Sequence, residues 1–68
     1  MKKLTEKLGK NMTRIRNEKG LTQGDIHRET GLDRAYINRV ESGQTNPTIS
    51  NLEKIAKALG IKPDELLK

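Results

Sequence analysis

The stretch Leu21–Val40, LTQGDIHRETGLDRAYINRV, predicts two short helices joined by a tight turn. Thr22 is a good N-cap for the first helix, because its hydroxyl can accept a hydrogen bond from a free N–H of the first turn. Gly31 stands where that helix should end, since glycine readily adopts the left-handed conformation that often follows a helix. Asp33 can cap the second helix two residues later. The rest of the chain should serve to hold this helix pair.

The second of these helices, over about residues 34–42, has two distinct faces. At 100° per residue, Ile37 and Val40 point to the same side, which predicts that they are buried. The other face carries small, polar and basic side chains, namely Ala35, Asn38, Arg39 and Ser42. Side chains of this chemistry can contact the edges of base pairs.

A long N-terminal helix is predicted by an apolar stripe at helical spacing. Its members are Leu4, Leu8, Met12 and Ile15. The helix should run to about Lys19 and end at Gly20. Gly9 interrupts the stripe, so either the first turns fray or Gly9 permits a close crossing with another helix.

Two further helices are predicted after the loop that contains Pro47. Thr48 is an N-cap for the first, whose apolar stripe comprises Ile49, Leu52, Ile55, Ala56 and Leu59. Pro63 suits the first position of a short fifth helix, in which Leu66 and Leu67 would be buried. The expected fold class is therefore all-α, with five helices in a single domain over residues 1–68.

Composition excludes several classes of site. The 68 residues include no Cys and one His, so we expect no disulfide, no metal site and no cofactor. Tyr36 is the sole aromatic residue, which excludes the stacking platforms that bind single-stranded nucleic acid. No apolar run is long enough to span a membrane, and the N-terminus lacks the apolar segment of a signal peptide. A cytoplasmic protein without a membrane partner is expected.

The net charge of +5 is unevenly distributed. Residues 1–19 carry seven Lys and Arg against two Glu, a net +5. Residues 20–46 carry three Arg against four acids, a net −1, and residues 47–68 carry four Lys against three acids, a net +1. A basic balance is compatible with nucleic-acid binding, but the predicted helix pair lies outside the basic block.

Three segments together resemble a known family. They are LGKNMTRIRNEKGLTQ (8–23), GLDRAYINRVESGQTNPT (31–48) and LEKIAKALGI (52–61). Over roughly residues 8–67 the chain resembles the lambda-repressor/Cro-like (XRE) helix-turn-helix family. Within that family, LDRAYINRVE (32–41) is similar to the controller proteins of restriction–modification systems.

The resemblance implies a mode of DNA binding in which the second helix of the motif enters the major groove. The first helix would then cross the phosphate backbone. The implied base-contacting residues are Gln23, Arg34, Ala35, Asn38 and Arg39. The implied backbone-contacting residues are Thr22, Tyr36 and Asn46. The resemblance also implies an internal salt bridge between Arg16 and Glu41, joining the first and third helices.

Three residues depart from the family pattern. His27 stands where a small residue, usually Ala, lies at the closest crossing of the two motif helices, and Thr30 stands where an aliphatic residue is usual. Overpacking such a crossing costs about 1–3 kcal/mol, so either the crossing is wider here or His27 swings to the edge. A partly buried His27 with a satisfied nitrogen is favoured over a pH switch. Gly24 lies in the first turn of its helix, where it either allows close approach to a phosphate or is simply tolerated.

The expected function is a sequence-specific regulator of transcription, such as a repressor, that binds double-stranded DNA. It would bind a palindromic operator as a homodimer formed through the fourth and fifth helices, with no small-molecule effector evident. The alternative is a protein-interaction module on the same fold, such as an antitoxin or adaptor, favoured by the −1 balance of residues 20–46 and by His27. An enzyme is not expected, because no paired carboxylates, nucleophile–base pair or phosphate loop occur at usable spacing.

Overall fold

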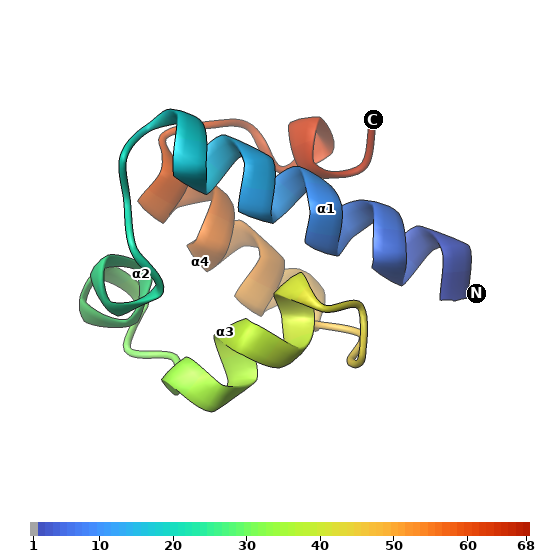
Figure 1. The fold of residues 1–68 in the computed structure, drawn as a ribbon, viewed down its shortest axis with the longest axis horizontal. Coiled ribbons are helices and arrows are strands. Elements are labelled where there is room, and N and C mark those ends of the chain that lie inside the picture. The colour runs from blue at the N-terminus through green and yellow to red at the C-terminus, as the bar shows by residue number, and fades with distance from the viewer. Residues whose placement is uncertain (1) are drawn as a thin grey trace.

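Four α-helices and a short 3-10 helix form the fold in the computed structural model, which describes residues 2–68 and the side chains from Leu4 onwards (Figure 1). They are α1 (Lys2–Glu18), α2 (Gln23–Thr30), α3 (Arg34–Glu41), α4 (Ile49–Leu59) and η1 (Pro63–Leu66). The first four agree closely with the helices predicted from the sequence. Among the described residues, no helix combines the length and the apolar character needed to cross a membrane.

The predicted fifth helix is wrong in kind, because Pro63–Leu66 forms a single 3-10 turn. Glu65 N–H donates to Lys62 O (3.0 Å), the i→i+3 spacing of a 3-10 helix, and four residues are too few to establish an α-helical pattern. Leu66 is buried as expected, whereas Leu67 remains 38% exposed.

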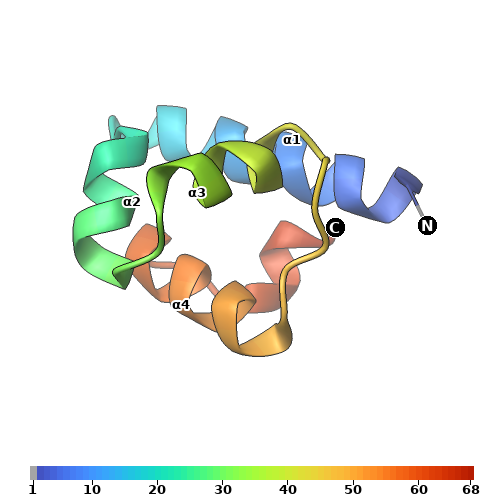
Figure 2. The same ribbon diagram turned by 90° about the horizontal axis from the view of Figure 1, so that it is seen from below.

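The helices enclose a single core between two groups of elements. α1 runs along the length of the molecule with α3 packed against it, while α4 and η1 close the opposite side (Figures 1 and 2). α2 lies at one end of the molecule, where it contacts both α3 and α4. The helix pair predicted to carry the function is thus supported from two sides.

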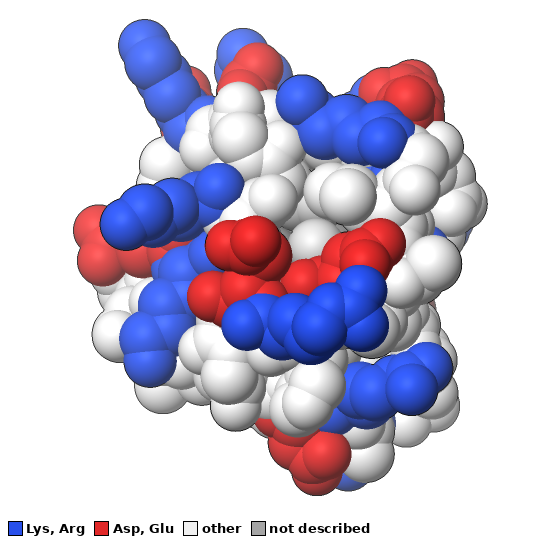
Figure 3. Space-filling model, turned by 90° about the vertical axis from the view of Figure 1, so that its left-hand side faces the viewer, with Lys and Arg blue, Asp and Glu red and all other residues white. Residues whose placement is uncertain are grey.

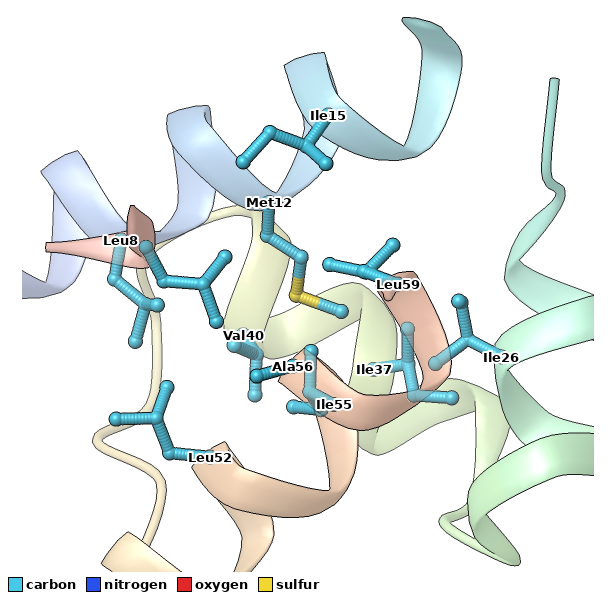
Figure 4. Close-up of a cluster of buried hydrophobic side chains, with 11 residues drawn as sticks. Leu8, Met12, Ile15, Ile26, Ile37, Val40, Leu52, Ile55, Ala56 and Leu59 are labelled. Atoms are coloured by element: carbon cyan, nitrogen blue, oxygen red, sulfur yellow. The ribbon is translucent and has the colours of Figure 1, made fainter. Parts of the chain in front are cut away.

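The core consists of residues that the sequence predicts to be buried, together with Ile26 of α2, and it leaves out two members of the apolar stripes. Figure 4 shows side chains from all four α-helices converging around Met12, which has no exposed surface. The buried residues are Leu8, Met12, Ile15, Ile26, Ile37, Val40, Leu52, Ile55, Ala56, Leu59 and Leu66. Leu4 and Ile49 were expected in the stripes but are 53% and 72% exposed, and each lies in the first turn of its helix.

Gly9 lies where α1 crosses the end of α3 at very short range. A Cβ placed on Gly9 would stand 2.3 Å from the carbonyl oxygen of Glu41 and 2.7 Å from that of Val40. Only a residue without a side chain permits this approach. Of the two interpretations of Gly9, the close helix crossing is confirmed.

We predict that Gly9→Ala destabilises the fold by about 1–3 kcal/mol, the usual range for overpacking, because the added methyl must push α3 away from α1. Urea unfolding followed by circular dichroism measures the difference. Gly24→Ala is the matched control, since its Cβ would meet nothing nearer than Thr22 Oγ1 at 3.5 Å. That variant should retain or gain stability, by up to about 1 kcal/mol. Equal unfolding midpoints for Gly9→Ala and the parent would contradict the prediction.

Candidate nucleic-acid interface

The start of α2 is fixed by a reciprocal pair of hydrogen bonds. Asp25 N–H donates to Thr22 Oγ1 (3.0 Å), and Thr22 N–H donates to Asp25 Oδ2 (2.8 Å), which confirms the predicted cap. The bond from the Thr22 backbone is the main reason that the pKa of Asp25 is lowered, and the Thr22 hydroxyl and the Arg28 guanidinium lower it further. Asp25 therefore stays ionised at neutral pH and keeps the cap closed.

α3 presents the two faces that its sequence predicts. Ile37 and Val40 have no exposed surface. The other face is exposed along the whole helix through Arg34, Ala35, Asn38, Arg39 and the following Ser42. The polar and basic face of α3 is thus open to a ligand, while its apolar face anchors it to the core.

An ion pair beneath α3 joins it to α1, as the resemblance implied. Arg16 Nε donates to Glu41 Oε2 (2.7 Å) and Nη2 to Oε1 (3.2 Å), and the two side chains are 13% and 6% exposed. Arg16 Nη1 also donates to Leu21 O (2.9 Å), so the same guanidinium holds the chain entering α2. Both members are structural.

Gln23 extends this network to the exposed face of α3. Its Nε2 donates to Glu41 Oε1 (2.9 Å) and to Asn38 Oδ1 (3.3 Å). Two predicted base-contacting residues, one from each helix, are therefore brought together and held in place.

The two predicted base-contacting arginines lie at opposite ends of α3. Arg34 is its first residue, and a Cβ placed on Gly24 would be only 3.8 Å from Arg34 Cζ and 3.7 Å from Arg28 Nη1. The guanidinium groups of Arg28 and Arg34 therefore lie close to the backbone of Gly24. Arg39 lies in the last turn of α3, away from this cluster.

The predicted backbone-contacting residues stand at the margins of α3. Tyr36 is half-buried, and its hydroxyl accepts a hydrogen bond from Asn51 Nδ2 (3.1 Å), which leaves the phenolic proton able to donate. Asn46 is exposed in the loop before α4. Asn51 was missed in the sequence analysis, because nothing local in the sequence marks a partner on another helix.

The turn between α2 and α3 differs from expectation at two residues. Asp33 occupies the N-cap position of α3, but its side chain forms no capping hydrogen bond. His27 is exposed rather than partly buried: it has swung to the edge, where Nδ1 lies 2.6 Å from Leu32 O. The predicted satisfied nitrogen is present, but the ring does not enter the helix crossing.

Charges on the side of the molecule where α2 lies are mixed. Figure 3 shows Lys and Arg interleaved with Asp and Glu across this face, with no uniform basic field. The described residues also contain no group of three His, Asp or Glu side chains placed to hold a metal ion. Any recognition by this face depends on individual side chains more than on net charge.

Comparisons with known proteins agree with this geometry. Residues 12–66 match the HTH_3 helix-turn-helix family. The HTH-type transcriptional regulator y4dJ of Sinorhizobium fredii, itself uncharacterised, is 40% identical over 60 residues, which cover 88% of this chain and 78% of that protein. The crystal structure of the restriction–modification controller protein C.AhdI from Aeromonas hydrophila superposes with a TM-score of 0.87 at 42% identity, covering 91% of this chain and 94% of the other.

A second structure shows such a fold on DNA. The controller protein C.Esp1396I, solved as a tetramer in complex with its natural 35-base-pair operator, superposes with a TM-score of 0.81 at 37% identity and covers 96% of each chain. The resemblance inferred from the sequence is confirmed, and the chain belongs to the HTH_3 (XRE-type) family of helix-turn-helix domains.

Proposed function

We propose that this chain is a sequence-specific regulator of transcription that binds double-stranded DNA and acts in the cytoplasm. α3 enters the major groove, and α2 crosses the phosphate backbone. The observation that carries the proposal is the exposed polar and basic face of α3, held rigidly from below by the Arg16–Glu41–Gln23 network. The operator complex of C.Esp1396I supports it. The proposal assigns no catalytic activity, cofactor or effector.

Base recognition is assigned to the exposed face of α3 and to the start of α2. The guanidinium groups of Arg34 and Arg39 match the acceptors O6 and N7 of guanine, and the Asn38 amide matches adenine. Ala35 is small enough to contact a thymine methyl group. Gln23, already bonded to Asn38, completes the set from α2.

Phosphate contacts are assigned to three groups around this face. The Tyr36 hydroxyl accepts a hydrogen bond from Asn51, so its proton is available to a phosphate oxygen. Thr22 is exposed at the N-terminus of α2, where the free N–H groups of a helix favour phosphate. The exposed amide of Asn46 supplies further donors. These contacts would set the register of α3 on the duplex without reading sequence.

Homodimer formation through α4 and η1 is the proposed assembly of this single domain, which spans residues 1–68. Apolar surface is exposed at Ile49 in α4 (72%) and at Leu67, the residue that follows η1 (38%). A two-fold dimer would set two α3 helices about 34 Å apart, one turn of DNA, on a palindromic operator. The tetramer of C.Esp1396I supports association of this fold on DNA.

The alternative function is a protein-interaction module, such as an antitoxin or adaptor. The mixed charge on the α2 side favours it, because a uniform basic field is absent there (Figure 3). The simplest way to distinguish the two functions is to measure the affinity of the protein for generic DNA at low salt.

We predict that selection from a random duplex pool yields a palindrome with half-sites about one helical turn apart. Binding measured by band shift should weaken steeply as salt rises, because phosphate contacts release counterions. Absence of binding to any duplex at low salt would contradict the proposal and favour the protein-interaction module.

Arg34→Ala should weaken binding to the selected operator by about 1–3 kcal/mol and relax the preference at one base pair. The reason is the loss of a guanidinium–guanine contact, and the measurement is the ratio of affinities for operator and scrambled duplex. Arg14→Ala is the control, since Arg14 is an exposed arginine on α1 paired with Glu18. It should keep the parent ratio. A parent-like ratio for Arg34→Ala would show that its assigned role is wrong.

Ile49→Glu should convert the dimer to a monomer at concentrations where the parent is dimeric, because it places charge in the apolar contact. The fold should survive, since Ile49 is 72% exposed in the single chain. Sedimentation velocity measures the change. Leu4→Glu is the control, because Leu4 is also exposed and apolar but lies on α1. If Leu4→Glu dissociated the dimer and Ile49→Glu did not, the proposed α4–η1 interface would be wrong.

A further inference from the structure

Two side chains of α2 hold the turn that leads into α3, and both act on Leu32. Thr30 Oγ1 accepts a hydrogen bond from Leu32 N–H (3.1 Å), while its own proton is donated to Ile26 O (2.7 Å). On the other side of the same residue, His27 Nδ1 lies 2.6 Å from Leu32 O. The peptide groups before and after Leu32 are therefore both tied to α2, which restricts the two backbone torsions between them.

The Leu32 side chain packs against the core, but few other contacts fix the backbone at the beginning of α3. Asp33 stands at its N-cap without a side-chain capping bond, and Gly31, in the left-handed conformation (φ 75°), is tied to α2 by its N–H to His27 O (2.8 Å). A glycine in this position is intrinsically flexible. The direction in which the chain enters α3 therefore depends on how Leu32 is held.

The contact with a carbonyl oxygen determines which nitrogen of the neutral His27 ring carries the proton. A carbonyl oxygen only accepts hydrogen bonds, so Nδ1 must carry the proton and donate it to Leu32 O. When the ring gains a second proton, the same donor remains. The contact therefore does not depend on the charge of the ring, which argues for a positioning role and against a pH switch.

We propose that His27 and Thr30 are positioning residues that determine DNA specificity by fixing α3 relative to α2 through Leu32. The proposal rests on the proposed function. The proposed base contacts come from both helices, so Gln23 on α2 and Arg34 on α3 must meet one duplex in a single register. Generic phosphate contacts tolerate rotation of α3, whereas base contacts do not, so loosening the turn reduces specific binding more than non-specific binding.

The first test uses the free protein and needs no DNA. Long-range ¹H–¹⁵N NMR correlations of the His27 ring, recorded at a pH where the ring is neutral, report which nitrogen carries the proton. The expected result is the Nδ1–H tautomer, which Leu32 O requires. The Nε2–H tautomer would overturn the proposal. This result stands whether or not the chain proves to bind DNA.

The second test compares removal of each hydrogen bond with its conservative replacement. His27→Ala and Thr30→Val remove the bonds, while His27→Asn and Thr30→Ser keep a donor and a hydroxyl. The readout is the ratio of affinities for the selected operator and a scrambled duplex at one salt concentration. We expect this ratio to fall about two- to tenfold in each removal variant, as the loss of its hydrogen bond to Leu32 predicts, and to recover in the conservative ones. Thr30→Val also removes the bond to Ile26 O, which Thr30→Ser restores.

Glu29→Ala is the matched control, because Glu29 is exposed on the same helix between the two positioning residues. It should keep the parent ratio, and circular dichroism melts should show every compared variant folded at the assay temperature. Parent-like ratios in His27→Ala and Thr30→Val would overturn the proposal, as would equal losses in the conservative variants. If the parent itself shows no sequence preference, the proposed function fails, and the tautomer still decides whether the turn is held as described.

Discussion

The ion pair between Arg16 and Glu41 is the interaction on which the arrangement of the helices depends. Ionic groups that are largely buried stabilise a fold only when their remaining hydrogen-bonding capacity is satisfied. Here Arg16 also donates to Leu21 O, and Glu41 also accepts from Gln23 Nε2. One pair of charges therefore holds α1, the segment entering α2, and α3 in a single geometry, and it does so beneath the face that is proposed to contact DNA.

Gly9 complements this ion pair by letting α1 lie directly on the last carbonyl groups of α3. The apolar face of α3 is then fixed by Ile37 and Val40, its C-terminal end by α1, and its side toward α2 by Gln23. With these three sides occupied, the remaining face is left entirely to solvent. The shape of the candidate interface is thus a consequence of packing on the other sides of one short helix.

Features that depend on neighbouring residues in the chain could be predicted from the sequence. The caps at Thr22 and Thr48 follow from hydroxyl side chains placed just before the two helices, and the left-handed Gly31 follows from a glycine at the end of the first. The same local patterns identified the core and the two faces of α3. The salt bridge of Arg16 with Glu41 was reached only through the family resemblance, because its partners are 25 positions apart in the sequence.

Features that depend on which elements face one another could not be predicted. Ile49 fits its stripe, yet its side chain is 72% exposed. Asp33 has the right chemistry for a cap, but its side chain does not form the bond. His27 has room at the edge of the turn, which no pattern of spacing reveals. In each case the outcome depends on the three-dimensional surroundings of a side chain whose local preferences are ordinary.

The hydrogen bond from Asn51 to the Tyr36 hydroxyl directly joins α4, the proposed dimer contact, to α3, the proposed DNA contact. Asn51 lies on α4 two residues after Ile49, so a shift of α4 against a second subunit would also displace the hydroxyl at the edge of α3. Where self-association and DNA contact are coupled in this way, thermodynamic linkage makes the effect reciprocal. Occupancy of the duplex would then strengthen the association of subunits by the same factor by which association strengthens binding to the duplex.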